Sequence, residues 1–344
     1  MSVAFDPNLI GQPNGNYFAL PYSIVEADIM LLSVPWDATA SYGIGAQKAP
    51  EAIIRASTQI DLYDADVQDA WKIRIGTVPP NALIAKLNAS TRRISSRVIA
   101  AEERGVPERR LVDEIVKVNI ACDQFNQRVY KMATKYLDAR KVVGLIGGDH
   151  SAPFGLLQAL NERYDDFGIL HIDAHADLRD AYEGFTYSHA SIMFNVLDQL
   201  RHVTKIVQVG VRDYCAEEAA LMASDARVVP FTDAALQEAS YNGVLWAQQC
   251  RDIVAALPEK VYVSFDIDGL TPENCPHTGT PVPGGLTYSQ TVFLLKTMVQ
   301  SGKKIISFDL CEVVPSEHDE WDANVGARLL FKLCCYSQWP VIGK

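Results

Sequence analysis

The 344-residue sequence lacks the features that mark secreted, membrane-spanning and nucleic-acid-binding proteins. It begins MSVAFDPNLIGQPNG, without the basic and then apolar segments of a signal peptide, and no apolar run approaches the about 20 residues that cross a bilayer. Basic residues are scarce, since 31 Lys and Arg stand against 42 Asp and Glu for a net charge of −11. We therefore expect a cytoplasmic protein whose partner is neither nucleic acid nor a membrane.

The seven cysteines lack the spacing of a disulfide framework or of a thiolate metal site. Their number is odd, and no CxxC pair occurs among them. We therefore expect reduced cysteines. With 48% hydrophobic and 21% charged residues, the composition is that of an ordinary globular protein, which argues against a disordered or fibrous chain.

Short apolar segments alternate with longer segments of helical period from Asp28 onward. This alternation predicts a mostly parallel sheet between two layers of helices, a three-layer αβα sandwich of the α/β class. Continuous runs of Val, Ile and Leu suit strands that are buried on both faces. The expected strands are 28–34, 142–146, 168–172, 205–210, 260–265 and 304–309. No linker-like segment interrupts them, so we expect one domain over 28–344, preceded by an N-terminal arm at 1–27.

One segment predicts a single long helix. Between Pro107 and Arg140, apolar residues recur at alternating intervals of four and three, which places them on one side of a helix. They are Leu111, Ile115, Val118, Cys122, Phe125, Val129 and Met132. This apolar stripe has to be buried, either against the chain's own sheet or against another subunit.

Aspartate and histidine residues gather where three of the expected strands end. The sequences are GGDHS at 147–151, HIDAHAD at 171–177 and DID at 266–268. Because ligands bind at the carboxyl ends of parallel strands, and alternate residues of an extended chain point the same way, these side chains can face one small volume. The candidate metal ligands are His150, Asp173, His175, Asp177, Asp266 and Asp268.

This ligand set indicates which metal it can hold. Four carboxylates in one place repel one another, and two divalent cations supply the charge that offsets them. Imidazole and carboxylate ligands without a thiolate suit Mn²⁺, with Fe²⁺, Co²⁺, Ni²⁺ and Zn²⁺ as competitors. We therefore expect two Mn²⁺ ions.

The three motifs, followed by a later His and Glu, resemble the ureohydrolase superfamily of arginases and agmatinases over residues 34–339. The resemblance implies the arginase/deacetylase-like fold, two Mn²⁺ per subunit bridged by Asp173 and Asp266, and a homo-oligomer, either a trimer or a hexamer. The segments DLRDAYEG at 177–184 and YSHAS at 187–191 look closer to agmatinases than to arginases.

The resemblance also implies roles for individual residues. Asp177 orients the metal-bound water and accepts its proton, His189 carries a proton to the leaving amine, and Glu312 accepts hydrogen bonds from the guanidinium. Arg179 and Glu183, in the agmatinase-like segment, are expected to contact the substrate beside Glu312 and His189.

The first expectation for function is hydrolysis of agmatine to putrescine and urea, a step of polyamine metabolism. Arginine, guanidinobutyrate and guanidine stay open as substrates, and an acyl-amide hydrolase or a non-catalytic homologue are the other classes. His171 and His277 are expected to support the site. Thr271 departs from the Asp that agmatinase relatives often carry there, and the segment 80–140 is longer than in the common bacterial enzymes, so it could reshape the pocket rim or a subunit interface.

Overall fold

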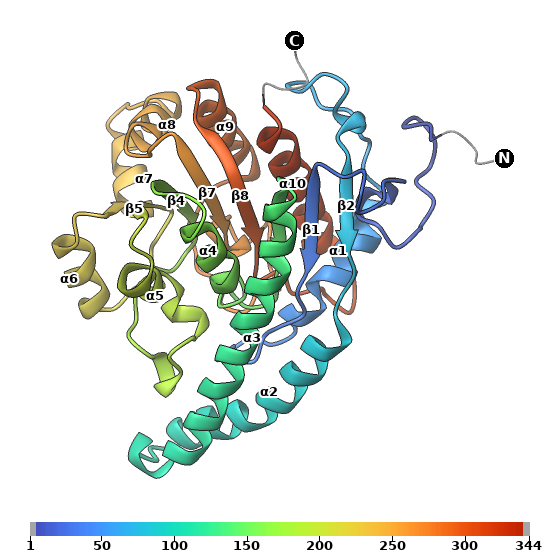
Figure 1. Ribbon diagram of the computed structural model, residues 1–344. Coiled ribbons are helices and arrows are strands. Elements are labelled where there is room, and N and C mark those ends of the chain that lie inside the picture. The colour runs from blue at the N-terminus through green and yellow to red at the C-terminus, as the bar shows by residue number, and fades with distance from the viewer. Residues whose placement is uncertain (1–4, 340–344) are drawn as a thin grey trace.

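The computed structural model describes residues 5–339, which form one eight-stranded sheet whose neighbouring strands all run parallel (Figure 1). The strands are β1 Ile29–Ser33, β2 Ile75–Val78, β3 Val142–Ile146, β4 Phe167–Ile172, β5 Val203–Val209, β6 Val228–Phe231, β7 Lys260–Phe265 and β8 Lys304–Leu310. Their order in space is β2-β1-β3-β8-β7-β4-β5-β6. The predicted α/β fold with a parallel sheet is confirmed.

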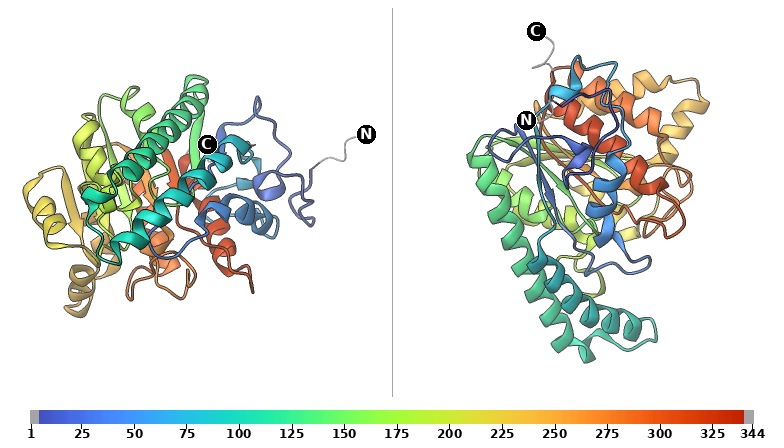
Figure 2. Two further views of the ribbon diagram at one scale, coloured as in Figure 1. Left: turned by 90° about the horizontal axis from the view of Figure 1, so that it is seen from below. Right: turned by 90° about the vertical axis from the view of Figure 1, so that its right-hand side faces the viewer.

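Helices cover both faces of this sheet, as the view from below shows (Figure 2). Helices α2 to α6 pack on one face, and α1 and α7 to α10 pack on the other. The helices are α1 Ala49–Ser57, α2 Ala82–Glu102, α3 Val112–Asp138, α4 Phe154–Asn161, α5 Ile192–Gln199, α6 Ala216–Ser224, α7 Asp233–Tyr241, α8 Trp246–Ala255, α9 Tyr288–Gln300 and α10 Trp321–Ser337. Short 3₁₀ helices occupy Tyr17–Ala19, Ala46–Lys48, Ala70–Lys72, Glu108–Arg110, Tyr182–Gly184, His189–Ser191 and Ile267–Gly269.

The central strands are apolar on both faces because both faces are covered. In β1, Ile29 and Leu31 belong to the core on one side of the sheet, while Met30 and Leu32 belong to the core on the other. This is the alternation that a strand imposes on successive side chains. The six expected strands are all present.

The sequence prediction missed two strands, β2 and β6, which are the two edges of the sheet. Each has only four residues, and each includes residues that are not buried, so neither shows a continuous apolar run. Strand β6 also contains Pro230, which argues against a strand in a sequence but is tolerated at an edge, where one side of the ladder is unpaired.

Helices α2 and α3 form a long antiparallel hairpin that extends beyond the sheet (Figures 1 and 2). The predicted long helix is α3, and Ile115, Val118 and Phe125 of its apolar stripe are buried. This stripe packs within the chain itself, against α2, α4 and the sheet. The stripe was expected to pack either on the chain's own sheet or on another subunit, and the structure shows it against the chain's own sheet and helices.

The expected N-terminal arm is partly built into the fold. Tyr17, Phe18 and Leu20 are buried in the core on the α1 side of the sheet, and the Tyr17 hydroxyl lies 3.0 Å from the Ser33 hydroxyl at the end of β1. The boundary of the arm at residue 27 stays a prediction. All seven cysteines are free thiols. Within residues 5–339, no helix combines the length and apolar character needed to cross a membrane.

Candidate metal centre and its pocket

The predicted site lies at the carboxyl ends of four strands that are neighbours in the sheet. These strands are β3, β8, β7 and β4. The residues that directly follow them are His150 after β3, Glu312 after β8, Asp266 and Asp268 after β7, and Asp173, His175 and Asp177 after β4. Segments far apart in the sequence therefore place their ligand-type side chains at one edge of the sheet.

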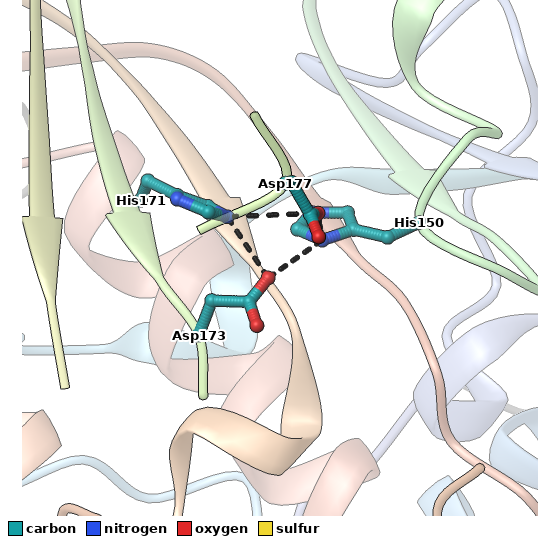
Figure 3. A group of neighbouring side chains, drawn as sticks. All are labelled: His150, His171, Asp173 and Asp177. Atoms are coloured by element: carbon teal, nitrogen blue, oxygen red, sulfur yellow. Dashed lines mark hydrogen bonds and ion pairs between the residues drawn. The ribbon is translucent and has the colours of Figure 1, made fainter. Parts of the chain in front are cut away.

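One group of ligand atoms surrounds the His150 ring. Its Nδ1 atom lies 2.9 Å from Asp173 Oδ2, 3.0 Å from Asp177 Oδ2 and 3.4 Å from Asp266 Oδ2. Figure 3 shows His150, Asp173 and Asp177 pointing toward one another. Metal–ligand bonds of about 2.1 Å at right angles put adjacent ligand atoms about 3 Å apart, so this spacing fits a cation.

A second group adjoins the first and shares Asp173 with it. His175 Nδ1 lies 3.2 Å from Asp268 Oδ2 and 3.5 Å from Asp173 Oδ1. Asp173 thus turns one oxygen toward each group, which is the arrangement of a bridging carboxylate. Asp266, also expected to bridge, presents Oδ2 to the first group, while its Oδ1 accepts the backbone N–H of Asp268 at 2.9 Å.

The charges of this cluster need compensation. Burial, and then the nearby Asp173, raise the pKa of Asp177 to about 6, and burial together with Asp268 raises the pKa of Asp266 well above its usual value. The buried Oδ2 atom of Asp177 accepts no hydrogen bond from the described residues. The donor set is carboxylate and imidazole without thiolate, so the residues fit divalent cations of the Mn²⁺ type.

His171 supports Asp173 from behind. Its Nε2 atom lies 2.9 Å from Asp173 Oδ2 (Figure 3), and the Gln208 amide donates to its Nδ1 at 3.1 Å. Because the Gln208 amide donates to Nδ1, Nε2 is the ring nitrogen that donates a hydrogen bond to the carboxylate. A ligand carboxylate held in this way keeps its orientation.

The second glycine of the GGDH motif allows two loops to touch. A Cβ atom at Gly148 would lie 1.8 Å from the carbonyl oxygen of Trp36, so only glycine fits. The carbonyl oxygen of Gly148 accepts the backbone N–H of Glu312 at 2.7 Å, and the Glu312 carboxylate accepts the backbone N–H of His150 at 2.8 Å. Glu312 has φ of 61°, which turns its buried side chain toward the metal centre.

A pocket of about 180 Å³ opens onto the cluster. Of the residues expected to act on substrate, Asp177, Arg179, His189 and Glu312 line it, and Glu183 does not. Burial and Asp149 raise the pKa of Glu312 well above its usual value, and a cation bound nearby would act in the opposite direction.

His189 is held at the pocket wall by hydroxyl groups. Its backbone N–H donates to Thr39 Oγ1 at 3.1 Å, and its Nε2 atom lies 3.3 Å from Ser41 Oγ. Burial, and then the neighbouring His175, lower the pKa of His189 to about 4. The ring is therefore neutral near pH 7.

Arg179 and Glu183 have different positions. The Arg179 guanidinium stacks 4.8 Å above the Tyr182 ring, and its Nε atom lies 3.6 Å from Glu218 Oε2 at the pocket. Glu183 has φ of 56° and faces away from the pocket, toward α2. There, burial and Glu102 raise the pKa of Glu183 to about 7. The structure therefore does not bring Glu183 to the expected substrate position.

Sequence reasoning missed several residues that line the pocket. Each follows the carboxyl end of a strand, which was one available signal, and Tyr182 also lies in the agmatinase-like segment 177–184. They are Ser41 after β1, Tyr182 after β4, Asp213 and Glu218 after β5, and Thr280 after β7. Thr271 lies outside the lining and accepts a hydrogen bond from Asn274 at 2.8 Å, so its departure from Asp affects a loop rather than the ligands.

Comparison with known proteins agrees with this geometry. The family model described as "Arginase family" matches residues 27–335. The N(1)-aminopropylagmatine ureohydrolase of Thermus thermophilus is 31% identical over 296 residues, which cover 86% of this chain and 85% of that protein. The agmatinase of Pyrococcus horikoshii is 26% identical over 316 residues, with 90% and 91% covered. The crystal structure of agmatine ureohydrolase of Thermoplasma volcanium superposes with a TM-score of 0.70 at 20% identity, covering 94% of both chains, and this likeness shows the fold.

Proposed function

The chain belongs to the arginase family as an agmatinase-like ureohydrolase that hydrolyses guanidino C–N bonds, and we propose that its substrate is agmatine, bound beside two Mn²⁺ ions. The family assignment sets aside the acyl-amide hydrolase and the non-catalytic homologue. In the reaction, water adds to the guanidinium carbon, the bond to the tail nitrogen breaks, and urea and a primary ammonium leave.

The proposed metal ligands are His150, Asp173, His175, Asp177, Asp266 and Asp268. When bound, the ions lower the pKa of water enough to provide a nucleophile near neutral pH. Asp177 and His189 both line the pocket, where the first orients water and the second passes a proton to the leaving nitrogen. Glu312 holds the guanidinium by charge-assisted hydrogen bonds.

The observation that carries the choice of agmatine is the acidic lining of the pocket. Among the described residues that line it, five are carboxylates and Arg179 is the single Lys or Arg. The ligand carboxylates balance the metals, Glu312 is assigned to the guanidinium, and Glu218 pairs with Arg179. Asp213 makes no ion pair with any described residue, so it is available to the ammonium group of a tail.

N(1)-aminopropylagmatine is the second candidate. The ureohydrolase of Thermus thermophilus named for that compound is 31% identical to this chain. Both compounds combine a guanidinium with a cationic tail, whereas guanidinobutyrate carries a carboxylate that Asp213 would repel.

Urea release from the Mn²⁺-loaded protein tests the proposal. We expect kcat/KM to be highest for agmatine, lower for the aminopropyl compound, and lowest for guanidinobutyrate, arginine and guanidine. Asp213→Asn should lower kcat/KM for agmatine about two- to fivefold, as for an exposed ion pair, and leave guanidine unaffected because it has no tail. Asp198→Asn, at an exposed carboxylate outside the pocket, is the matched control. Preference for guanidinobutyrate over agmatine would overturn the choice of substrate.

A further inference from the structure

Helix α2 turns a polar stripe toward the loop that follows β1. Asn88, Arg92 and Ser95 are spaced by four and three residues, so they lie on one side of the helix. All three hydrogen-bond to loop 36–42, and Asn88 and Ser95 are buried. The partners on the loop are Asp37 for Asn88, the carbonyl of Ala40 for Arg92, and the carbonyl of Ala38 for Ser95.

The residues between these anchor points hold His189. Thr39 lies between the two anchored carbonyls, and its hydroxyl accepts the backbone N–H of His189 at 3.1 Å while donating to Asp149 Oδ2 at 2.8 Å. Ser41 follows the second anchored carbonyl, and its hydroxyl lies 3.3 Å from His189 Nε2. Both the backbone and the ring of His189 are therefore positioned by a loop that α2 fixes.

Helix α3 holds the same region from the other arm of the hairpin. The ring of Phe125, from the predicted apolar stripe, stacks on Trp36 at 4.1 Å between centroids and 5° between planes. Asn119 donates to the carbonyl of Gly184 at 3.0 Å and accepts the backbone N–H of Thr186 at 2.9 Å, in the segment that leads to His189.

We propose that Arg92 and Ser95 are positioning residues for His189, and that the α2–α3 hairpin sets the geometry of proton transfer in the pocket. The inference rests on the proposed function, since it assigns the hairpin a part in that reaction. It gives the long segment 80–140 a role within the active site.

Helix α2 has two pairs of identical neighbours, Arg92-Arg93 and Ser95-Ser96, in which the first residue contacts loop 36–42 and the second is exposed and serves as its control. Arg92→Met and Ser95→Ala each remove one hydrogen bond to loop 36–42, while Arg93→Met and Ser96→Ala change exposed side chains one position along. With agmatine, we expect the first two variants to lower kcat about fivefold, the rate equivalent of one lost hydrogen bond, with KM changed less than about twofold. The two control variants should retain the activity of the unmodified protein, and equal losses in all four would overturn the proposal.

Two further measurements separate positioning from general destabilisation. In a protein that already carries His189→Ala, Arg92→Met should lower kcat little further, because the ring that Arg92 positions is absent. If Arg92→Met instead reduced the amount of folded protein, it would lower the rate by the same factor with or without His189→Ala. Arg92→Lys keeps a donor for the Ala40 carbonyl and should restore most of kcat. Full additivity with His189→Ala, or no rescue by Lys, would contradict the proposal.

Amide hydrogen exchange keeps the test independent of activity. Peptides covering 36–42 and 186–191 should exchange faster in Arg92→Met and Ser95→Ala than in the two controls. If the unmodified protein released no urea from any guanidino compound, the proposed function would fail, and exchange would still decide whether α2 orders the His189 region. Exchange equal to that of the controls would overturn the positioning role.

Discussion

Glu312→Gln should lower kcat/KM about a hundredfold for every guanidino substrate while both metal ions stay bound. One oxygen of the Glu312 carboxylate accepts the backbone N–H of His150 at 2.8 Å, which leaves the other oxygen for the substrate. In the Gln variant the amide oxygen is the single acceptor. If it serves His150, an NH₂ group faces the N–H donors of the guanidinium, and if it serves the substrate, that NH₂ group faces the backbone N–H instead.

The magnitude follows from these two effects. Replacing a charge-assisted hydrogen bond with a neutral one removes part of a term of about 1–3 kcal/mol, and a buried donor facing a donor adds a comparable cost. Together the two effects remove about 3 kcal/mol of transition-state stabilisation, which corresponds to roughly a hundredfold loss in rate. Glu312 is only 7% exposed, so water cannot easily replace the lost partner.

The assay is urea release at several concentrations of agmatine, guanidinobutyrate and guanidine, with metal content measured on the same samples. Glu312→Asp is the control, because it keeps the charge and shortens the side chain, so it should lose less activity than the Gln variant. The loss in Glu312→Gln should be similar for all substrates, since the contact is to the group they share. If agmatine were impaired and guanidinobutyrate spared, Glu312 would contact the tail amine, and its assignment to the guanidinium would be refuted.

Three other predictions concern the metals, the proton shuttle and pH. Asp173→Ala and Asp266→Ala should each abolish activity and metal retention in a soluble protein, and a normal metal content in either variant would contradict the binuclear centre. His189→Ala should keep both metals and lose kcat, so loss of metal or full activity across the pH range would count against the shuttle. The hydrogen bond that His277 Nδ1 donates to Asp322 Oδ2 at 2.7 Å raises the pKa of His277 above its usual 6.5, so the pair stabilises the fold fully below that pH and less as pH rises through the raised pKa. Thermal melts should therefore show a larger loss of Tm for His277→Ala at pH 6 than at pH 9, and equal losses would refute the charged pair.

The sequence predicts the centre of the sheet and the convergence of the ligand motifs because both depend on local pattern. Strands β3, β4, β7 and β8 are mostly apolar segments, and the Asp and His residues follow three of them. Parallel strands end on one edge, so position in the chain is enough to bring His150 and Asp173 together without knowledge of the strand order. The edge strands β2 and β6 have only four residues each, include residues that are not buried, and carry no such pattern.

The pocket wall could not be predicted in the same way because it depends on backbone turns and on contacts across the chain. Ala181 and Glu183 both have positive φ, at 52° and 56°, although neither is glycine, and no pattern in the sequence signals this turn. This turn leaves Tyr182 in the lining of the pocket and Glu183 outside it. Ser41 reaches His189 across 148 residues of sequence, and only the three-dimensional fold shows that contact.

These two kinds of placement divide the site into parts that should respond differently to substitution. The ligand residues follow strands whose register is fixed by the sheet, so a change there alters metal binding and the reaction together. His189 instead depends on loop 36–42, and α2 holds that loop through side chains that touch neither metal ligands nor substrate. Changes on α2 should therefore slow turnover while metal content stays normal. In this fold we expect the sheet to set which chemistry is available, and the α2–α3 hairpin to set how well His189, the proposed proton-transfer group, is aligned to use it.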